Sequence, residues 1–342
     1  MNLYRPIIVG LSSITLTALE RHWLRELSPY GVILFSRNVQ TPEQLRELCA
    51  SIRDHIGEDA VILIDQEGGR VQRLRSAFWR TLPSALQIGK LWRKNRFKGL
   101  DAAHSLGQII GSQLAESGIT HTAAPVLDLH ITGASQVIGD RSFGSTPAEI
   151  IPLATAFIDG LDRTGVTAIV KHIPGMGRAQ TDSHVSLPII DTPTKLLKQT
   201  DWLPFQKLKG TCWAMTTHAV IADWDHLPVT ISEKSIQSIR KILGDWSLIS
   251  DCLTMDAISG SINERVQKTL AAGVDIALFS NGSDDERQLA VESAGPKSVV
   301  RDERKFLQAM PEDQHDHAVR KLSQLINENR LASDPTWDQE SI

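Results

Sequence analysis

The segment Thr167-Ala-Ile-Val-Lys-His172 is a short apolar run that ends in a lysine and a histidine. Seven more runs of this kind occur along the chain, mostly continuous rather than alternating with polar residues. Such runs are expected for strands that are buried on both faces of a parallel sheet. The eight runs occupy residues 6–10, 31–35, 60–65, 122–127, 167–172, 212–218, 246–251 and 274–279.

Helical patterns with start signals separate these runs. Thr146-Pro-Ala-Glu149 is a capping box with proline at the first helical position, and Thr41 and Ser232 open two further helices. Eight strands that alternate with helices predict an α/β fold, a single (β/α)8 TIM-type barrel. An open doubly wound sheet is the alternative. It is disfavoured because the first βα turn has no Gly-x-Gly-x-x-Gly sequence.

The chain has 342 residues, a length that fits either one barrel or two average domains. We expect the barrel and its C-terminal helices to span residues 1–333. Apolar residues between positions 318 and 326 share one helical face, which predicts an amphipathic helix on the outside of the barrel. Residues 334–342 are expected to form a flexible tail.

Composition excludes some classes of protein. Lys and Arg number 36 and Asp and Glu number 40, so the formal net charge of −4 argues against a basic nucleic-acid binder. Three widely spaced cysteines suit a reducing cytoplasm, and no apolar run approaches the roughly 18 residues of a membrane span. We therefore expect a soluble, unprocessed, cytoplasmic monomer without nucleic-acid or membrane partners.

Polar residues collect where the predicted strands end. In a barrel the carboxyl ends of the strands carry the active site, although a single charge there can be only a solvated strand end. Five such residues on one face favour a site. They are Asp65, Lys171, His172, His218 and Asp251.

The loop after the third run contains Asp65 and Arg73, separated by a pair of glycines. Asp65 can accept hydrogen bonds from sugar hydroxyls and Arg73 can donate them. The alternative is an ion pair between the two that only fixes the loop.

The loop after the fifth run holds Gly175 and Gly177, followed by Asp182 and His184. The glycines indicate a loop that can move. Asp182 can support His184 as a proton donor near neutral pH, whereas the alternative is an ordinary surface histidine. A metal site of His172, Asp182 and His184 lacks the usual ligand spacing, and no cofactor is expected.

Asp251 is the first carboxylate after the seventh run that can point into the mouth of the barrel. A carboxylate there can attack an electrophilic carbon. Asp256 lies about one turn further on and can instead cap the next helix, so Asp251 is the preferred nucleophile.

Taken together, the motifs resemble those of the glycoside hydrolase family 3 β-N-acetylhexosaminidases, of the compact bacterial type that acts in peptidoglycan recycling. The resemblance covers roughly residues 5–282. Met176 stands where the family often has a histidine, and Cys252 where it often has an aspartate. The matching segments are 31–38, Asp65-Gln-Glu-Gly-Gly-Arg-Val-Gln-Arg73, 124–128, Val137-Ile-Gly-Asp-Arg-Ser-Phe143, Lys171-His-Ile-Pro-Gly-Met-Gly177, Asp182-Ser-His184 and 250–255.

This resemblance implies a retaining exo-β-N-acetylglucosaminidase that works through a glycosyl-enzyme intermediate. Asp251 matches the nucleophile, and His184 supported by Asp182 matches the acid/base. The implied substrate is N-acetylglucosaminyl-1,6-anhydro-N-acetylmuramic acid, with or without peptide. The residues that match the family's binding site for terminal N-acetylglucosamine are Asp65, Arg73, Arg141, Lys171 and His172.

Three other functions remain open from the sequence. A phosphorylase can use the same barrel, because a neutral histidine does not repel phosphate as a carboxylate does. The other two are a sugar-binding protein without catalytic activity and a metal-dependent amidohydrolase. If His184 is not the proton donor, Glu67 is the next candidate.

Overall fold

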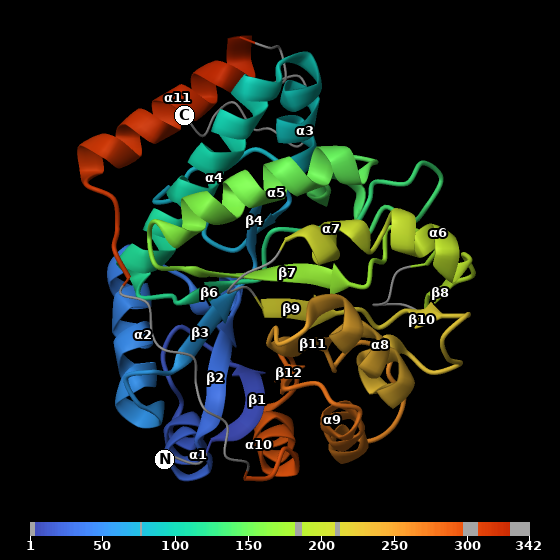
Figure 1. Ribbon diagram of the computed structural model, residues 1–342. Coiled ribbons are helices and arrows are strands. Elements are labelled where there is room, and N and C mark those ends of the chain that lie inside the picture. The colour runs from blue at the N-terminus through green and yellow to red at the C-terminus, as the bar shows by residue number, and fades with distance from the viewer. Residues whose placement is uncertain (1–3, 76, 182–186, 209–212, 297–306, 329–342) are drawn as a thin grey trace.

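The computed structural model describes residues 4–75, 77–181, 187–208, 213–296 and 307–328. Its centre is a closed barrel of eight parallel strands, in the order β1-β12-β11-β9-β7-β6-β3-β2. The fold prediction is therefore confirmed (Figure 1). The barrel strands are β1 (Arg5–Gly10), β2 (Pro29–Leu34), β3 (Val61–Ile64), β6 (His121–Thr122), β7 (Thr167–Ile173), β9 (Trp213–Thr216), β11 (Leu248–Cys252) and β12 (Ile276–Phe279).

Each of the eight predicted runs overlaps a strand of the barrel, but the fourth run shares only Thr122 with its strand. Residues 122–127 were expected to form a strand, whereas β6 ends at Thr122 and only an isolated bridge from Val126 to Lys171 continues the pairing. Pro125 lies between them and has no N–H to donate to a ladder. The chain therefore leaves regular pairing early, just before Asp128.

Helices surround the barrel in the order that the sequence predicts. Thr41 and Ser232 accept hydrogen bonds as the N-caps of α2 and α8, and Thr146 precedes α5 with Glu149 completing its capping box. The helices are α1 (Ala18–Leu27), α2 (Pro42–Ile56), α3 (Ala85–Lys94), α4 (Arg96–Ser117), α5 (Pro147–Asp162), α6 (Thr194–Gln199), α7 (Leu203–Lys207), α8 (Glu233–Leu243), α9 (Ile262–Ala271), α10 (Asp284–Ser293) and α11 (Glu312–Glu328).

The amphipathic helix expected around residues 318–326 is α11. It packs on α4 beside α3, outside the barrel (Figure 1). The residues buried on this helix are Ala318, Val319, Leu322, Leu325 and Ile326, as the helical spacing predicts. The predicted tail, residues 334–342, lies outside the described residues.

Alternate residues of the strands supply two separate cores. On β2, Val32 and Leu34 pack outward against the helices, whereas Ile33 belongs to the cluster inside the barrel. Trp213 begins β9 and packs in that cluster against Tyr30 and His121, with ring centroids 5.6 and 5.2 Å away. These rings start their strands, so they fill the amino-terminal end of the barrel interior and leave the carboxyl end open for a site.

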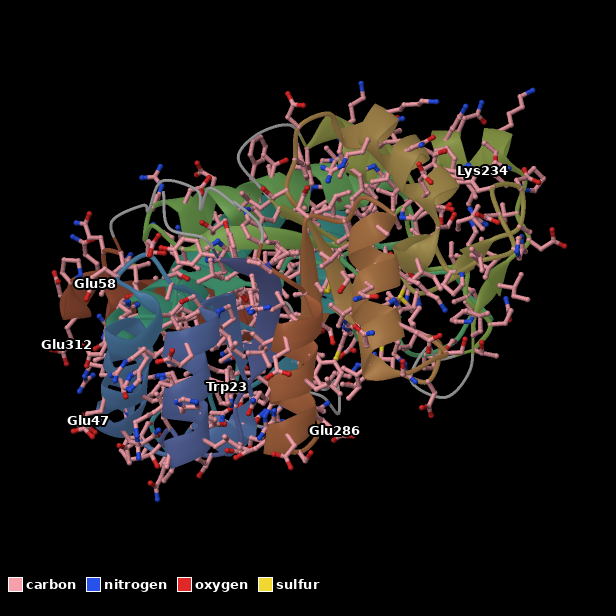
Figure 2. All side chains as sticks on the ribbon, turned by 90° about the horizontal axis from the view of Figure 1, so that it is seen from below. Trp23, Glu47, Glu58, Lys234, Glu286 and Glu312 are labelled. Atoms are coloured by element: carbon pink, nitrogen blue, oxygen red, sulfur yellow. The ribbon has the colours of Figure 1, made fainter. Side chains whose placement is uncertain are left out.

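Charged residues lie on the outer surface. Glu47, Lys234 and Glu286 are exposed and extend from α2, α8 and α10 (Figure 2). Trp23, in contrast, is buried between α1 and its neighbours. An amphipathic helix such as α1 thus buries one apolar face and leaves its polar face exposed.

Candidate active site

A cavity of about 460 Å³ opens at the carboxyl ends of the barrel strands. Its size is typical of a small-molecule site. Five predicted strand-end or loop residues line it, namely Asp65, Arg73, Lys171, His172 and Asp251. Arg141, predicted only from the family resemblance, lines it as well. The remaining strand-end candidate, His218, does not line the cavity. It is buried, and its ring nitrogens hydrogen-bond with the hydroxyl of Thr230 and the carbonyl of Cys252.

A small hairpin after β3 presents two of the acidic residues. It consists of β4 (Gln66–Gly68) and β5 (Val71–Gln72), and Gly68 and Gly69 turn the chain with φ values of 92° and 55°. Gln66 holds the returning strand, because its Oε1 accepts from the backbone N–H of Arg73 at 2.8 Å. The hairpin thereby places Glu67 in the cavity and brings Arg73 back to Asp65.

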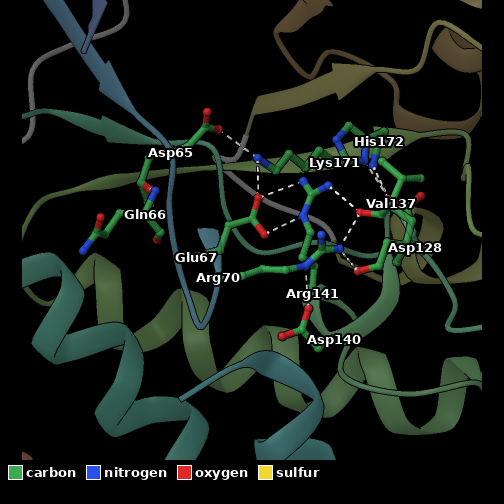
Figure 3. Close-up of polar contacts among 12 residues, drawn as sticks. Asp65, Gln66, Glu67, Arg70, Asp128, Val137, Asp140, Arg141, Lys171 and His172 are labelled. Carbon is green, nitrogen blue, oxygen red and sulfur yellow. Dashed lines mark hydrogen bonds and ion pairs between the residues drawn. The ribbon is translucent and has the colours of Figure 1, made fainter. Parts of the chain in front are cut away.

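Five charged side chains form one continuous network across the cavity. Figure 3 shows four of them, Asp65, Glu67, Arg141 and Lys171. Asp65 binds Arg73 at 3.0 Å and Lys171 at 2.9 Å. Lys171 also binds Glu67 at 2.7 Å, and Arg141 donates from Nε and Nη2 to the two oxygens of Glu67, each at 2.9 Å. The ion pair between Asp65 and Arg73 therefore exists, and both partners still line the cavity.

The network keeps its two carboxylates ionised. Burial by itself raises the pKa of Asp65, but the charges and hydrogen bonds of Lys171 and Arg73 hold that pKa well below its usual range. Burial opposes the ionisation of Glu67 as well, yet Arg141 and Lys171 lower its pKa to about 2. Burial also disfavours the charge on Arg141, and Glu67 outweighs that effect and raises the pKa of Arg141.

These shifts remove Glu67 as the reserve proton donor that the sequence left open. A general acid must carry a proton at the working pH. A carboxyl group with a pKa of about 2 is ionised at neutral pH, and both of its oxygens already accept hydrogen bonds from cations.

Asp251 differs from the other carboxylates of the cavity. It lies in β11, is 7% exposed, and accepts a hydrogen bond at 2.7 Å from the backbone N–H of Cys252. Within the described part of the chain it forms no ion pair with a lysine or arginine. Asp256 is exposed, and it does not cap the next helix, because Ser261 is the N-cap of α9. Asp256 also lines the cavity but is exposed, so Asp251 is the buried carboxylate of the cavity that binds no cation of the described residues.

His172 is fixed by a buried carboxylate. Its Nδ1 lies 2.6 Å from Oδ2 of Asp128, and the other oxygen of Asp128 accepts from the backbone N–H of Met176 at 2.7 Å. Asp128 therefore orients the imidazole that lines the cavity and also holds the chain that follows β7.

Gly175 and Gly177 allow the chain after β7 to pack closely against its neighbours. A side chain at Gly177 would place its Cβ 2.1 Å from the carbonyl oxygen of Leu129, and Gly175 has φ of 120° beside Asp201. Met176, between them, is buried against Val126 and Ile138. These glycines permit close packing in this conformation, and the mobility of the loop stays a prediction.

Cys252 occupies the position after Asp251 and lines the same cavity. Its Sγ lies 2.7 Å from Oγ of Ser280 and 3.0 Å from Oγ1 of Thr254. The thiol therefore connects β11 with the end of β12, next to the candidate nucleophile.

Asp182 and His184 lie outside the described residues, so their roles stay predictions. The described residues contain no group of three or more His, Cys, Asp or Glu side chains placed to hold a metal ion. None of the described helices is long and apolar enough to cross a membrane.

Sequence reasoning gave too little weight to three residues of the site. Glu67 was considered only as a reserve acid, and Asp128 only as part of a matching segment. Arg70 was likewise considered only as part of a matching segment, although it lines the cavity and binds Asp140 at 2.7 Å. A signal existed for Asp128, which follows the fourth apolar run as Asp65 follows the third.

Comparison with known proteins identifies the class. The glycosyl hydrolase family 3 N-terminal domain matches residues 8–310, most of the chain. The chain belongs to glycosyl hydrolase family 3, and it is a glycoside hydrolase. This result confirms the resemblance that the motifs indicate.

Three similar proteins are named as hexosaminidases or N-acetylglucosaminidases, or were solved with an N-acetylglucosamine analogue. A protein named beta-hexosaminidase from Alkalilimnicola ehrlichii is 37% identical over 282 residues, which is 81% of this chain and 80% of the relative. NagZ from Neisseria gonorrhoeae, solved in complex with N-trifluoroacetyl-D-glucosamine, is 28% identical with a TM-score of 0.82. That alignment covers 95% of this chain and 98% of NagZ. A family 3 beta-N-acetylglucosaminidase from a Paenibacillus species is 28% identical with a TM-score of 0.78, and covers 96% of this chain and 62% of that protein.

Proposed function

We propose that this protein is a retaining exo-β-N-acetylglucosaminidase. The observation that carries the proposal is the cavity in which Asp251, free of cations, accompanies a fixed network of hydrogen-bond donors and acceptors. Such a network suits the hydroxyl groups of one terminal sugar, and the carboxylate suits attack on its anomeric carbon.

In the proposed reaction Asp251 attacks the anomeric carbon as the bond to the leaving oxygen breaks. The leaving oxygen takes a proton from His184, which Asp182 supports. Water then attacks the glycosyl ester, His184 takes the proton of that water, and Asp251 is released. Two inversions at the same carbon retain its configuration. One carboxylate and one histidine thus replace the usual pair of carboxyl groups.

The proposed substrates are N-acetylglucosaminyl-1,6-anhydro-N-acetylmuramic acid and its peptide-bearing forms, acted on in the cytoplasm during recycling of the cell wall. The names of the similar proteins support an N-acetylglucosamine substrate. The family resemblance in the motifs supports the muropeptide, and the absence of a disulfide framework in the sequence supports the compartment.

Replacing Arg141 by alanine should lower kcat/KM by about one to two orders of magnitude, because a charge-assisted hydrogen bond contributes roughly 1.5–3 kcal/mol. The assay is hydrolysis of an aryl N-acetyl-β-glucosaminide. A matched control is Arg93→Ala, which removes an arginine that pairs with Glu149 at 2.7 Å outside the cavity. Wild-type kinetics for Arg141→Ala would remove Arg141 from the sugar site.

The proposed function itself is tested by turnover of the same aryl glycoside with and without inorganic phosphate. Release of free N-acetylglucosamine at the same rate in both conditions supports a hydrolase. Dependence on phosphate with formation of a sugar phosphate would indicate a phosphorylase. Absence of turnover, together with sugar binding, would indicate a sugar-binding protein without catalytic activity.

A further inference from the structure

Glu67 receives a donor set that is characteristic of oxyanion binding. Arg141 offers two parallel N–H groups to its two oxygens at 2.9 Å, and Nζ of Lys171 adds a third donor at 2.7 Å. A planar guanidinium fork with an ammonium beside it also matches sulfate or phosphate. Figure 3 shows the carboxylate of Glu67 between these two cations.

Burial strengthens the electrostatic attraction between Glu67 and its two cations. The side chain of Lys171 is 3% exposed, that of Glu67 6% and that of Arg141 13%, so water screens their charges weakly. Three cations of the network, Arg73, Arg141 and Lys171, meet only two carboxylates, Asp65 and Glu67. Removal of the charge on Glu67 would therefore leave two uncompensated positive charges in the network instead of one.

We propose that Glu67 is a positioning residue whose carboxylate fills an oxyanion site formed by Arg141 and Lys171. It holds both cations in the geometry that the sugar requires, and it keeps inorganic oxyanions out of the cavity. The part that concerns the sugar rests on the proposed function. The exclusion of anions rests only on the geometry of the network.

The test compares the wild type with Glu67→Gln and Glu67→Asp. Glu67→Gln should raise KM for the aryl N-acetylglucosaminide about tenfold to a hundredfold, with a smaller change in kcat, because the two cations lose their charged anchor. Inorganic sulfate should then inhibit this variant competitively, and sodium chloride of equal ionic strength should not. The wild type should show no competitive inhibition by sulfate.

Glu67→Asp keeps the charge on a shorter side chain. It should raise KM, because the cations are held in a different place, and it should remain insensitive to sulfate. Glu149→Gln is the matched control, because Glu149 is also a buried glutamate that binds an arginine, at a helix start away from the cavity. It should lower the melting temperature without changing KM or the response to sulfate.

Thermal unfolding with added sulfate supplies a readout that needs no turnover. The melting temperature of Glu67→Gln should fall, and sulfate should raise it by more than it raises that of the wild type, each measured against sodium chloride of equal ionic strength. A failure of the wild type to hydrolyse the glycoside would refute the proposed function and leave this readout intact. If sulfate neither inhibits nor stabilises Glu67→Gln, or if it inhibits the wild type equally, the proposed oxyanion site is wrong. An unchanged KM in Glu67→Gln would refute the positioning role.

Discussion

Replacing Asp251 by asparagine should abolish turnover while the fold and the binding of N-acetylglucosamine stay intact. A neutral amide cannot form the glycosyl ester that the proposed mechanism requires. The substitution is nearly isosteric, and Asp251 forms no ion pair with a lysine or arginine among the described residues. Its loss should therefore disturb the packing little. Turnover is measured on the aryl glycoside, and binding by calorimetry with N-acetylglucosamine.

A 2-fluoro sugar that slows the second step should leave an adduct on the peptide that contains Asp251. The comparison variant is Asp256→Asn, which changes the exposed carboxylate that lines the same cavity five residues further on and should keep most of the activity. An adduct on Asp256 or Glu67 would overturn the assignment. Glu67 is a poor nucleophile in this structure, because Arg141 and Lys171 occupy both of its oxygens.

Replacing His184 by alanine should slow a natural disaccharide much more than an activated aryl glycoside. A sugar alkoxide needs a proton to leave, whereas a nitrophenolate leaves almost unaided. General acid–base catalysis typically contributes ~10²–10⁴-fold, so the loss on the disaccharide should fall in that range. The ratio of the two rates measures the effect and is insensitive to a general loss of folded protein.

Asp182→Asn should give a milder form of the same result, because it removes the support and keeps the acid. The basic limb of the pH profile should weaken or move in this variant. If His184→Ala slows hydrolysis of both substrates equally, His184 binds the substrate but is not the proton donor. Glu67 could not then take over as the acid, since its pKa of about 2 leaves it ionised at neutral pH.

The barrel could be predicted because its signals are local. Each continuous apolar run overlaps a strand. Thr41, Thr146 and Ser232 mark helix starts, because an N-cap residue interacts with residues no more than three positions further on. The shortening of β6 also had a local signal in Pro125. The buried face of α11 follows from its helical spacing alone.

The charged network could not be predicted in the same way. Glu67, Arg141 and Lys171 lie in three separate loops or strand ends, and no spacing in the sequence brings them together. Arg141 was predicted only from the family resemblance, and nothing local distinguished Glu67 from a solvated loop residue. Gly175 and Gly177 suggest mobility, which stays a prediction, whereas their close approach to Leu129 and Asp201 has no local signal in the sequence. The ion-pair partners of Glu67 are 74 and 104 residues away in the sequence, so only the folded structure shows that they meet.

We propose that the protein removes terminal N-acetylglucosamine from muropeptides. The most direct test is mass spectrometry of N-acetylglucosaminyl-1,6-anhydro-N-acetylmuramic acid, with and without peptide, before and after incubation with the protein. The disaccharide mass should disappear while free N-acetylglucosamine and the intact anhydromuramyl product appear, in phosphate-free buffer as well as with phosphate. An unchanged disaccharide, loss of the peptide instead of the sugar, or formation of N-acetylglucosamine 1-phosphate would contradict it.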